Sequence, residues 1–345
     1  MVLAPAIVNL LPKEKDGNTV PPSMTQYLFI LLIGLVCAGG GGELFIRGAV
    51  GLAAWARIPA GIIGATVAAF ATSSPELSVA ISSSLAGTPQ ISVGDAVGSN
   101  IVNIGAILGI ALLMSPTRAP REGLRRDFPT ALLVPVALGL LALDGYLSRG
   151  DGFILLCLFV AWLVATVIEA RRVRAATLEG EATEQVLSVK PAAAVLMSLG
   201  GLVLLVISGR TIVSGAVGIA SAFGLDSFVI GATVVALGTS VPELATTVLA
   251  KLRGHQEVAM GTILGSNIFN GLFIIGVAAV IAPVHLSLPS VAAGLAVGAV
   301  LTICAYPPAS GVLPRSRGGV LLVLYAVYVT MLLLLRPGAG AGLPH

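Results

Sequence analysis

Two glutamates, Glu76 and Glu243, lie inside stretches of the sequence that are otherwise apolar. Each ends a Thr-Ser-x-Pro-Glu sequence, at positions 72–76 and 239–243. If these stretches cross a membrane, each ionised carboxylate costs roughly 2.5 kcal/mol or more unless something pairs with it. No basic residue lies in the core of either stretch, so a bound cation is the simplest partner.

The residues just before the glutamates fit the same interpretation. Pro75 and Pro242 lack an amide hydrogen, so each helix should kink before its glutamate and leave a backbone carbonyl without its usual donor. Thr72 and Thr239 lie four residues before the glutamates, which places hydroxyl and carboxylate oxygens on one helix face. A single copy of this motif would favour a plain kink with a snorkelling carboxylate, whereas two equivalent copies favour a site.

A second polar motif occurs twice, at 98–103 and 265–270, and reads Gly-Ser-Asn-Ile-x-Asn. Its serine and its last asparagine share a helix face by their i, i+4 spacing. Alone, they would serve as hydrogen-bonding groups between helices. Beside the glutamates, they supply the neutral oxygens that Ca²⁺ or Na⁺ requires. The four residues are Ser99, Asn103, Ser266 and Asn270.

Other metal chemistry is not expected. The three histidines fall at predicted helix ends or at the terminus, and the three cysteines show no CxxC spacing. We expect no resident cofactor, and Ca²⁺ and Na⁺ as transported substrates. The histidines are His255, His285 and His345.

The composition sets the class of protein that must position these motifs. Only 10% of the 345 residues are charged, 56% are hydrophobic, and the mean hydropathy is +1.01. Soluble domains carry roughly a quarter charged residues, so nucleic-acid binders, secreted scaffolds and cytosolic enzymes are disfavoured. The low aromatic content and the 42 glycines favour closely packed helices over a β-barrel. We therefore predict an all-α integral membrane protein in contact with the lipid bilayer and with no nucleic-acid partner.

Ten apolar segments can be read along the chain, five on each side of a polar linker at 171–190. The first half is predicted at 25–170 and the second at 191–336, with tails at 1–24 and 337–345. The predicted spans lie at 25–55, 58–87, 90–115, 128–147, 151–170, 191–222, 226–252, 257–283, 287–306 and 318–335.

An internal repeat relates the two halves. A shift of 167 positions aligns residues 48–110 with 215–277 without a gap, with about 26 identities in 63 pairs. The repeats extend over about 43–110 and 210–277. Because each belongs to a five-helix half, the second copy must enter the membrane inverted, which is typical of secondary transporters.

The basic residues predict the orientation. In the ten-helix arrangement, 13 Lys and Arg fall on the side of the linker and four on the other. This bias predicts a multi-pass protein of the cell inner or plasma membrane, with a cytoplasmic linker and both termini outside. The oligomeric state is left open, and one copy suffices for the predicted mechanism.

Four charged residues near or inside spans are expected to have local roles. Arg47 should pair with Glu43 at i, i+4 spacing, and Arg210 should snorkel, with a role in gating as the alternative. Asp95 and Asp144 lie near predicted span ends and are expected to be solvated.

The paired motifs resemble the α-repeats of the calcium/cation antiporter superfamily, of its prokaryotic-like sodium/calcium exchanger type. The resemblance is specific over about 130 residues. It implies ten helices, a long first and sixth helix that slide against a fixed core, and a central group of cation sites. The ligands it implies are the carboxylates of Glu76 and Glu243, the side chains of Thr72, Ser73, Ser99, Thr239, Ser240 and Ser266, and the backbone carbonyls of Ala69, Thr72, Ala236 and Thr239.

Two positions depart from the family pattern. Ala71 replaces a glycine that the second copy keeps as Gly238, and Asn270 stands where many of these exchangers have an aspartate. The expected site then has two carboxylates and a charge of −2, which one Ca²⁺ or two Na⁺ neutralise. An exchange of three Na⁺ for one Ca²⁺ is therefore in question, and coupling to protons becomes an alternative. The proton-coupled branch of the superfamily, however, typically carries a different glutamate motif.

The sequence thus predicts an antiporter that exchanges Na⁺ for Ca²⁺ by alternating access, with a Ca²⁺/H⁺ antiporter that uses the same glutamates as the nearest alternative. An intramembrane enzyme with a serine nucleophile would need a general base, and no His or Lys lies near the motifs. A channel is a further alternative, but inverted repeats with broken helices favour alternating access.

Overall fold

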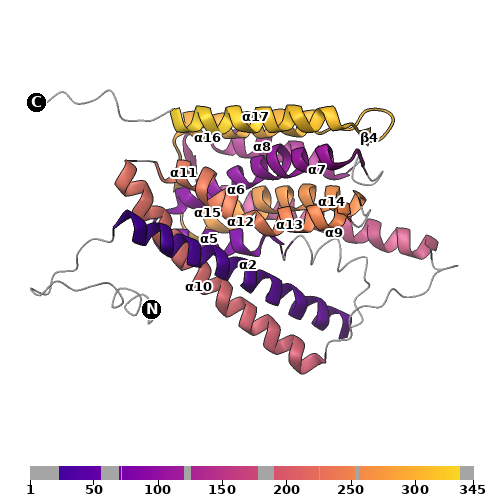
Figure 1. Ribbon diagram of the computed structural model, residues 1–345, viewed down its shortest axis with the longest axis horizontal. Helices are drawn as coiled ribbons and strands as arrows, with labels where there is room; N and C mark the ends of the chain where they lie inside the picture. The colour runs from indigo at the N-terminus through magenta and orange to yellow at the C-terminus, as the bar shows by residue number, and fades with distance from the viewer. Residues whose placement is uncertain are drawn as a thin grey trace, which may run out of the picture.

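The computed structural model describes residues 23–55, 70, 72–119, 126–177, 190–224, 226–252 and 256–334. These residues are almost entirely helical, with four two-residue strands and short stretches of π-helix that include η2, η4 and η5 (Figure 1). In chain order the elements are α2 (Met24–Trp55), α5 (Ser74–Leu85), α6 (Pro89–Ile101), η2 (Val102–Leu108), α7 (Gly109–Met114), β1 (Thr117–Arg118), α8 (Phe128–Leu141), β2 (Tyr146–Leu147), α9 (Arg149–Thr177), α10 (Pro191–Phe223), α11 (Ser227–Ile230), η4 (Gly231–Val235), α12 (Ala236–Thr239), α13 (Val241–Leu252), α14 (Gln256–Ile268), η5 (Phe269–Ile274), α15 (Ile275–Ile281), β3 (Val284–His285), α16 (Leu288–Cys304), β4 (Val312–Leu313) and α17 (Arg315–Leu334).

Six helical stretches among the described residues are long and apolar enough to cross a membrane. A seventh is made of the segments Ser227–Thr239 and Val241–Val248, which meet at a bend of 40°. Helices α8 and α16 are apolar but shorter. Each of the ten apolar segments predicted from the sequence overlaps at least one of these helices or α5.

The longest helices, α2 and α10, lie side by side on one face of the molecule (Figure 1). They run antiparallel, and glycines allow a close approach at several levels. A Cβ on Gly41 would lie 2.8 Å from Leu204 Cβ, and one on Gly215 would lie 2.9 Å from Leu31 Cβ. Helix α2 also passes over the start of α5, because Gly42 faces Ser74. The long pair therefore covers the region where the first Thr-Ser-x-Pro-Glu motif lies.

Both arginines in these helices are exposed. Arg47 Nε donates to Glu43 Oε1 at 2.6 Å, which confirms the predicted local ion pair. Arg210 is also exposed.

The centre of the molecule is formed by helices that are buried along most of their length. Helix α6 packs closely on α11 and η4, since a Cβ on Gly94 would clash with the carbonyl oxygen of Phe228, and one on Gly98 would lie 2.5 Å from that of Ala232. On the η4 side, a Cβ on Gly231 would lie 2.5 Å from the carbonyl oxygen of Ile91. The two halves of the chain thus meet backbone to backbone.

The helical elements repeat with the same 167-residue shift as the sequence. Adding 167 to the bounds of α5 gives 241–252, the bounds of α13, and adding it to those of α6 gives 256–268, the bounds of α14. The π-helical stretch η2 corresponds in the same way to η5, within one residue at its end.

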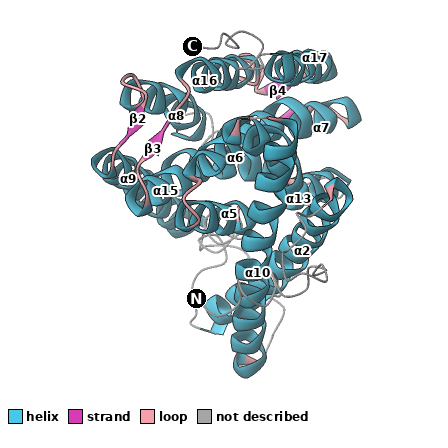
Figure 2. Cartoon of the chain, turned by 90° about the vertical axis from the view of Figure 1, so that its left-hand side faces the viewer, coloured by secondary structure: helices cyan, strands magenta, loops and turns pink. Residues whose placement is uncertain are grey.

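The short strands connect one half of the chain to the other. Strand β1 pairs antiparallel with β4, and β2 pairs antiparallel with β3. In Figure 2 the β2–β3 pair and β4 lie on different sides of the helices. Because β3 is the 167-residue counterpart of β1, the two pairs repeat one arrangement, and each joins a loop of one half to a loop of the other.

At one end of the molecule, two basic side chains donate to carbonyl groups at the end of α7. Lys251 Nζ donates to Ser115 O at 2.6 Å and to Thr117 Oγ1 at 2.7 Å, and Arg315 donates to Met114 O at 2.9 Å. These groups cap the C-terminal end of α7, where cations are favourable.

A pair of equivalent glycines tests the backbone contact. Gly94→Ala should lower the free energy of unfolding by about 1–3 kcal/mol, because the added methyl group meets backbone that cannot move aside. The matched control is Gly261→Ala, 167 residues later, where no atom lies within 4 Å of the new Cβ. Thermal denaturation in detergent compares the two variants. A Gly94→Ala variant as stable as Gly261→Ala would contradict this packing.

Candidate cation-binding site

Glu76 and Glu243 are completely buried, and each lies in the first turn of a helix. Helix α5 begins at Ser74, after a break at Ser73, and α13 begins at Val241, after a break at Ser240. The kink expected before Glu243 is confirmed by the bend of 40° at that point. A helix start also presents free amide groups, whose partial positive charge favours a nearby carboxylate.

Hydroxyl groups from one copy of the repeat meet those from the other. Thr72 Oγ1 lies 3.2 Å from Ser266 Oγ, and Thr239 Oγ1 lies 3.4 Å from Ser99 Oγ. Thr239 is the counterpart of Thr72 and Ser266 that of Ser99, so these are two copies of one contact. The structure therefore brings the Thr-Ser-x-Pro-Glu motif of each half against the Gly-Ser-Asn motif of the other half.

The two glutamates differ in their hydrogen bonds. Glu243 Oε1 accepts from Ser73 Oγ and from Ser266 Oγ, both at 3.3 Å. Neither carboxylate oxygen of Glu76 has a hydrogen-bond partner, and neither does Glu243 Oε2. The Ser240 hydroxyl is buried and also lacks a partner. Three buried carboxylate oxygens of the glutamates are therefore open to a positively charged ligand.

The prediction that Asp95 is solvated is wrong. Its side chain is fully buried, and Oδ1 accepts from Thr239 Oγ1 at 3.0 Å and from Ser99 Oγ at 3.5 Å, while Oδ2 has no partner. The cause is the close contact of α6 through Gly94 and Gly98, which buries this helix from its first turns. Asp144, by contrast, is exposed as predicted.

The structure thus contains three carboxylates where two were expected. Glu76 lies close enough to Glu243 and to Asp95 for their charges to interact. None of the ion pairs among the described residues involves these three side chains.

The two predicted asparagine ligands lie in the π-helical stretches, Asn103 in η2 and Asn270 in η5, and both are fully buried. Asn103 Nδ2 donates to Asn267 Oδ1 at 3.0 Å, which leaves Asn103 Oδ1 without a partner. Neither Nδ2 nor Oδ1 of Asn270 has a hydrogen-bond partner. Short π-helical stretches are frequent at functional sites because they turn side chains out of the regular helical register.

Two further asparagines, which the sequence did not single out as ligands, join the halves. Asn100 Nδ2 donates to Asn267 O, and Asn267 Nδ2 donates to Asn100 O, each at 3.0 Å. The two residues are 167 positions apart, so this reciprocal pair marks the axis that relates the repeats.

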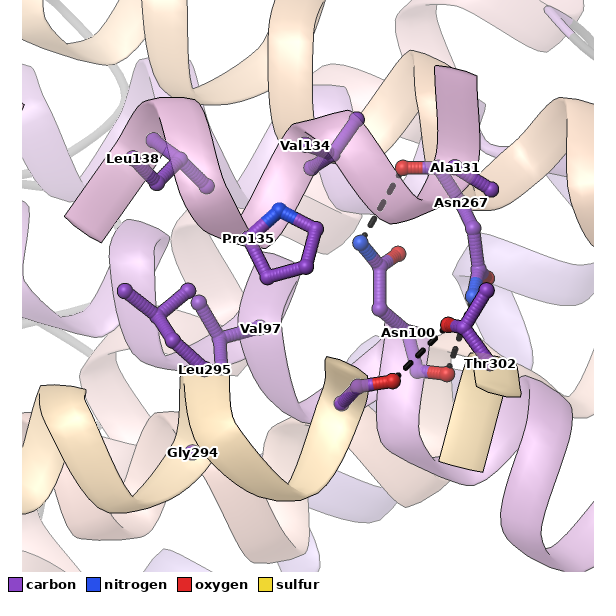
Figure 3. A pocket seen from close by; sticks show the side chains of 11 residues that line it. Val97, Asn100, Ala131, Val134, Pro135, Leu138, Asn267, Gly294, Leu295 and Thr302 are labelled. Carbon is purple, nitrogen blue, oxygen red and sulfur yellow. Dashed lines mark hydrogen bonds between the residues drawn. The ribbon is translucent and has the colours of Figure 1, made fainter. Parts of the chain in front are cut away.

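A small pocket lies beside this pair (Figure 3). Apart from Asn100, Asn267 and Thr302, its lining is apolar and comes from α6, α8 and α16. It includes none of the three carboxylates, and we do not assign it to the cation site.

The backbone ligands suggested by the family resemblance can be examined only in part. Ala236 is buried, and its carbonyl oxygen accepts a hydrogen bond from Ser240 N at 3.1 Å. Ala69 lies outside the described residues, as do His255 and His345. His285 lies in strand β3, away from the helix centres.

The donor set indicates which ions could bind. Among the described residues, no three His, Cys, Asp or Glu side chains are close enough to form a metal centre by themselves. An ion held between the repeats would therefore depend on carboxylate, hydroxyl, amide and backbone oxygens together. Such oxygen ligands suit hard cations such as Ca²⁺ and Na⁺ rather than transition metals.

Comparison with known proteins agrees with this chemistry. The model of the sodium/calcium exchanger protein family matches residues 26–168 and 193–334. The chain is 36% identical over 259 residues to the inner membrane protein YrbG of Escherichia coli, which covers 74% of this chain and 79% of YrbG. It is 37% identical over 257 residues to the putative antiporter CaxA of Alkalimonas amylolytica, covering 73% and 80% of the two chains.

A solved structure of the sodium-calcium exchanger NCX_Mj, soaked with Na⁺ and Sr²⁺, has the same fold. It superposes with a TM-score of 0.63 and 28% sequence identity, and the match covers 89% of this chain and 99% of that one. The chain belongs to the sodium/calcium exchanger protein family.

Proposed function

We propose that this protein is a secondary antiporter that exchanges Na⁺ for Ca²⁺ across the membrane. The observation that carries the proposal is the pair of buried glutamates, Glu76 and Glu243, each within a cluster of hydroxyl groups contributed by both repeats. Family membership supports cation antiport, and the oxygen donor set supports Ca²⁺ and Na⁺ as the ions.

The proposed architecture has ten transmembrane helices in two inverted five-helix halves, 25–170 and 191–336. The equal spacing of α5 and α13, the asparagine pair and the repeated strand pairing support a two-fold relation between these halves. We place the linker at 171–190 in the cytoplasm. The contacts of Lys251 and Arg315 with α7 support this, because they gather residues predicted on the linker side at one end of the molecule.

The proposed mechanism is competition for shared oxygens. Ca²⁺ and Na⁺ would both bind at the carboxylates of Glu76 and Glu243 and at the neighbouring hydroxyl and amide groups, so they could not occupy the site together. An unloaded site would bury uncompensated negative charge, which makes its occlusion within the membrane costly. The protein would therefore change sides only when loaded. The pair α2 and α10, which passes over Ser74, would move to open the site to one side or the other.

A second candidate is exchange of Ca²⁺ for H⁺ at the same residues. It is favoured by one observation: neither oxygen of Glu76 accepts a hydrogen bond. A proton on this carboxyl group would neutralise a buried charge that none of the ion pairs among the described residues compensates.

Removing one charge should stop exchange. Glu243→Gln and Glu76→Gln keep the side-chain shape but remove a carboxylate from the buried site. Na⁺-driven uptake of radiolabelled Ca²⁺ into vesicles should fall at least about tenfold, since a lost charged ligand is worth well over 1.4 kcal/mol. Asp144→Asn, which alters an exposed aspartate, is the matched control and should transport normally. Uptake in either glutamine variant equal to the wild type would exclude the proposal.

The identity of the driving ion is tested separately. Vesicles that contain the wild-type chain should take up Ca²⁺ when an outward Na⁺ gradient is imposed at equal pH on both sides. A pH gradient without Na⁺ should give no uptake above that of empty vesicles. The opposite pattern would replace Na⁺ by H⁺ as the coupling ion and leave Ca²⁺ antiport intact.

A further inference from the structure

Asp95 is the acidic residue of the buried cluster that the repeat does not duplicate. Glu76 and Glu243 are counterparts under the 167-residue shift, whereas the counterpart of Asp95 is Thr262. The position where the family resemblance leads one to expect a third acid, Asn270, carries a neutral amide instead. The chain therefore has a third buried carboxylate on α6 rather than in η5.

The hydrogen bonds of Asp95 mirror those of Glu243. In one half of the cluster, Thr72 meets Ser266, and Ser266 donates to Glu243. In the equivalent half, Thr239 meets Ser99, and the hydroxyl groups of both residues donate to Asp95 Oδ1. Asp95 thus accepts from a hydroxyl of each motif, one from each half of the chain, as Glu243 does.

The buried carboxylate oxygens that have no hydrogen-bond partner indicate a bound ligand. Asp95 Oδ2, both oxygens of Glu76 and Glu243 Oε2 are buried and have no hydrogen-bond partner. Buried carboxylate oxygens without donors or counter-charges are strongly unfavourable in a low-dielectric interior. These three acids are not close enough to enclose one ion together, so a single cation would leave at least one of the carboxylates uncompensated.

From this arrangement we infer that Asp95 is the third carboxylate of the cation site and supplies the counter-charge for a third Na⁺. The inference rests on the proposed function and adds to it the residue that would compensate the third Na⁺. With Glu76, Glu243 and Asp95 ionised, the cluster carries a charge of −3, which three Na⁺ neutralise. Ca²⁺ is matched by the two glutamates alone. Asp95 therefore acts mainly on Na⁺ binding, and the loss of an acid at Asn270 is compensated from a neighbouring helix.

The test measures ion binding by the full-length chain in detergent, without transport. The dissociation constant for Ca²⁺ is determined at two saturating Na⁺ concentrations that differ tenfold. In the wild type this constant should rise about 1,000-fold between them, because three Na⁺ compete with one Ca²⁺. In Asp95→Asn, which keeps a hydrogen-bond acceptor but removes the charge, the rise should be about 100-fold.

Two further variants separate charge from structure. Asp95→Asn combined with Asn270→Asp returns a third acid to the cluster and should restore the steep dependence on Na⁺. Asp144→Asn is the control and should match the wild type. Size-exclusion chromatography and the melting temperature report whether each variant is folded.

The outcomes are distinguishable. If Asp95→Asn responds to Na⁺ as steeply as the wild type, or if its defect, including failure to fold, is not repaired by Asn270→Asp, Asp95 is only structural and this inference is overturned while the proposed exchange stands. If Na⁺ does not displace Ca²⁺ from the wild type at all, the proposed function falls and the inference falls with it.

Discussion

The constraint on which the rest of this structure depends is the burial of negative charge in a membrane protein without a basic side chain to neutralise it. Glu76, Glu243 and Asp95 are all fully buried, and the ion pairs among the described residues lie elsewhere. The fold reduces this cost with helix starts at both glutamates and with hydroxyl groups from the opposite half of the chain. It does not remove the cost, because four carboxylate oxygens remain without partners. We propose that bound cations supply the missing positive charge.

The surrounding architecture serves the same constraint. Each helix that carries a glutamate begins inside the fold with a proline in its first turn, and the second copy is bent by 40° at this point. Glycines at positions 94, 98 and 231 let the two halves approach backbone to backbone, so that hydroxyl groups of one half reach carboxylates of the other. The reciprocal bond between Asn100 and Asn267 fixes the two halves at their common axis. Residues related by the repeat form most of the site. Asp95 has no acidic counterpart in the second half of the chain, so the two halves of the site differ in charge.

Much of this could be predicted from the sequence. The two glutamates stand out because they are rare charges in apolar segments, and the repeat shows that they are equivalent. The kink at Pro242 follows from the missing amide hydrogen alone, and the Glu43–Arg47 pair follows from helical spacing alone. These features depend on local chemistry or on identity between the repeats, and both can be read directly from the residues.

The rest depends on tertiary packing. Asp95 lies only five residues into a predicted span, so its position indicates solvation, yet the glycine contacts of α6 bury it. The signal that could have identified it is its lack of an acidic counterpart, since Thr262 takes that place in the second copy. The π-helical stretches that hold Asn103 and Asn270 leave no mark in the periodicity of an apolar segment, and the strand pairs are too short to be recognised.

The central claim is that one buried cluster between the repeats holds Ca²⁺ and Na⁺ in turn. Crystals of the protein soaked with Sr²⁺, which scatters anomalously and substitutes for Ca²⁺, test this claim most directly. An anomalous peak should appear between the carboxylates of Glu76 and Glu243 and should fade as the Na⁺ concentration in the soak is raised. A peak located elsewhere, or one at the glutamates that Na⁺ does not diminish, would contradict it.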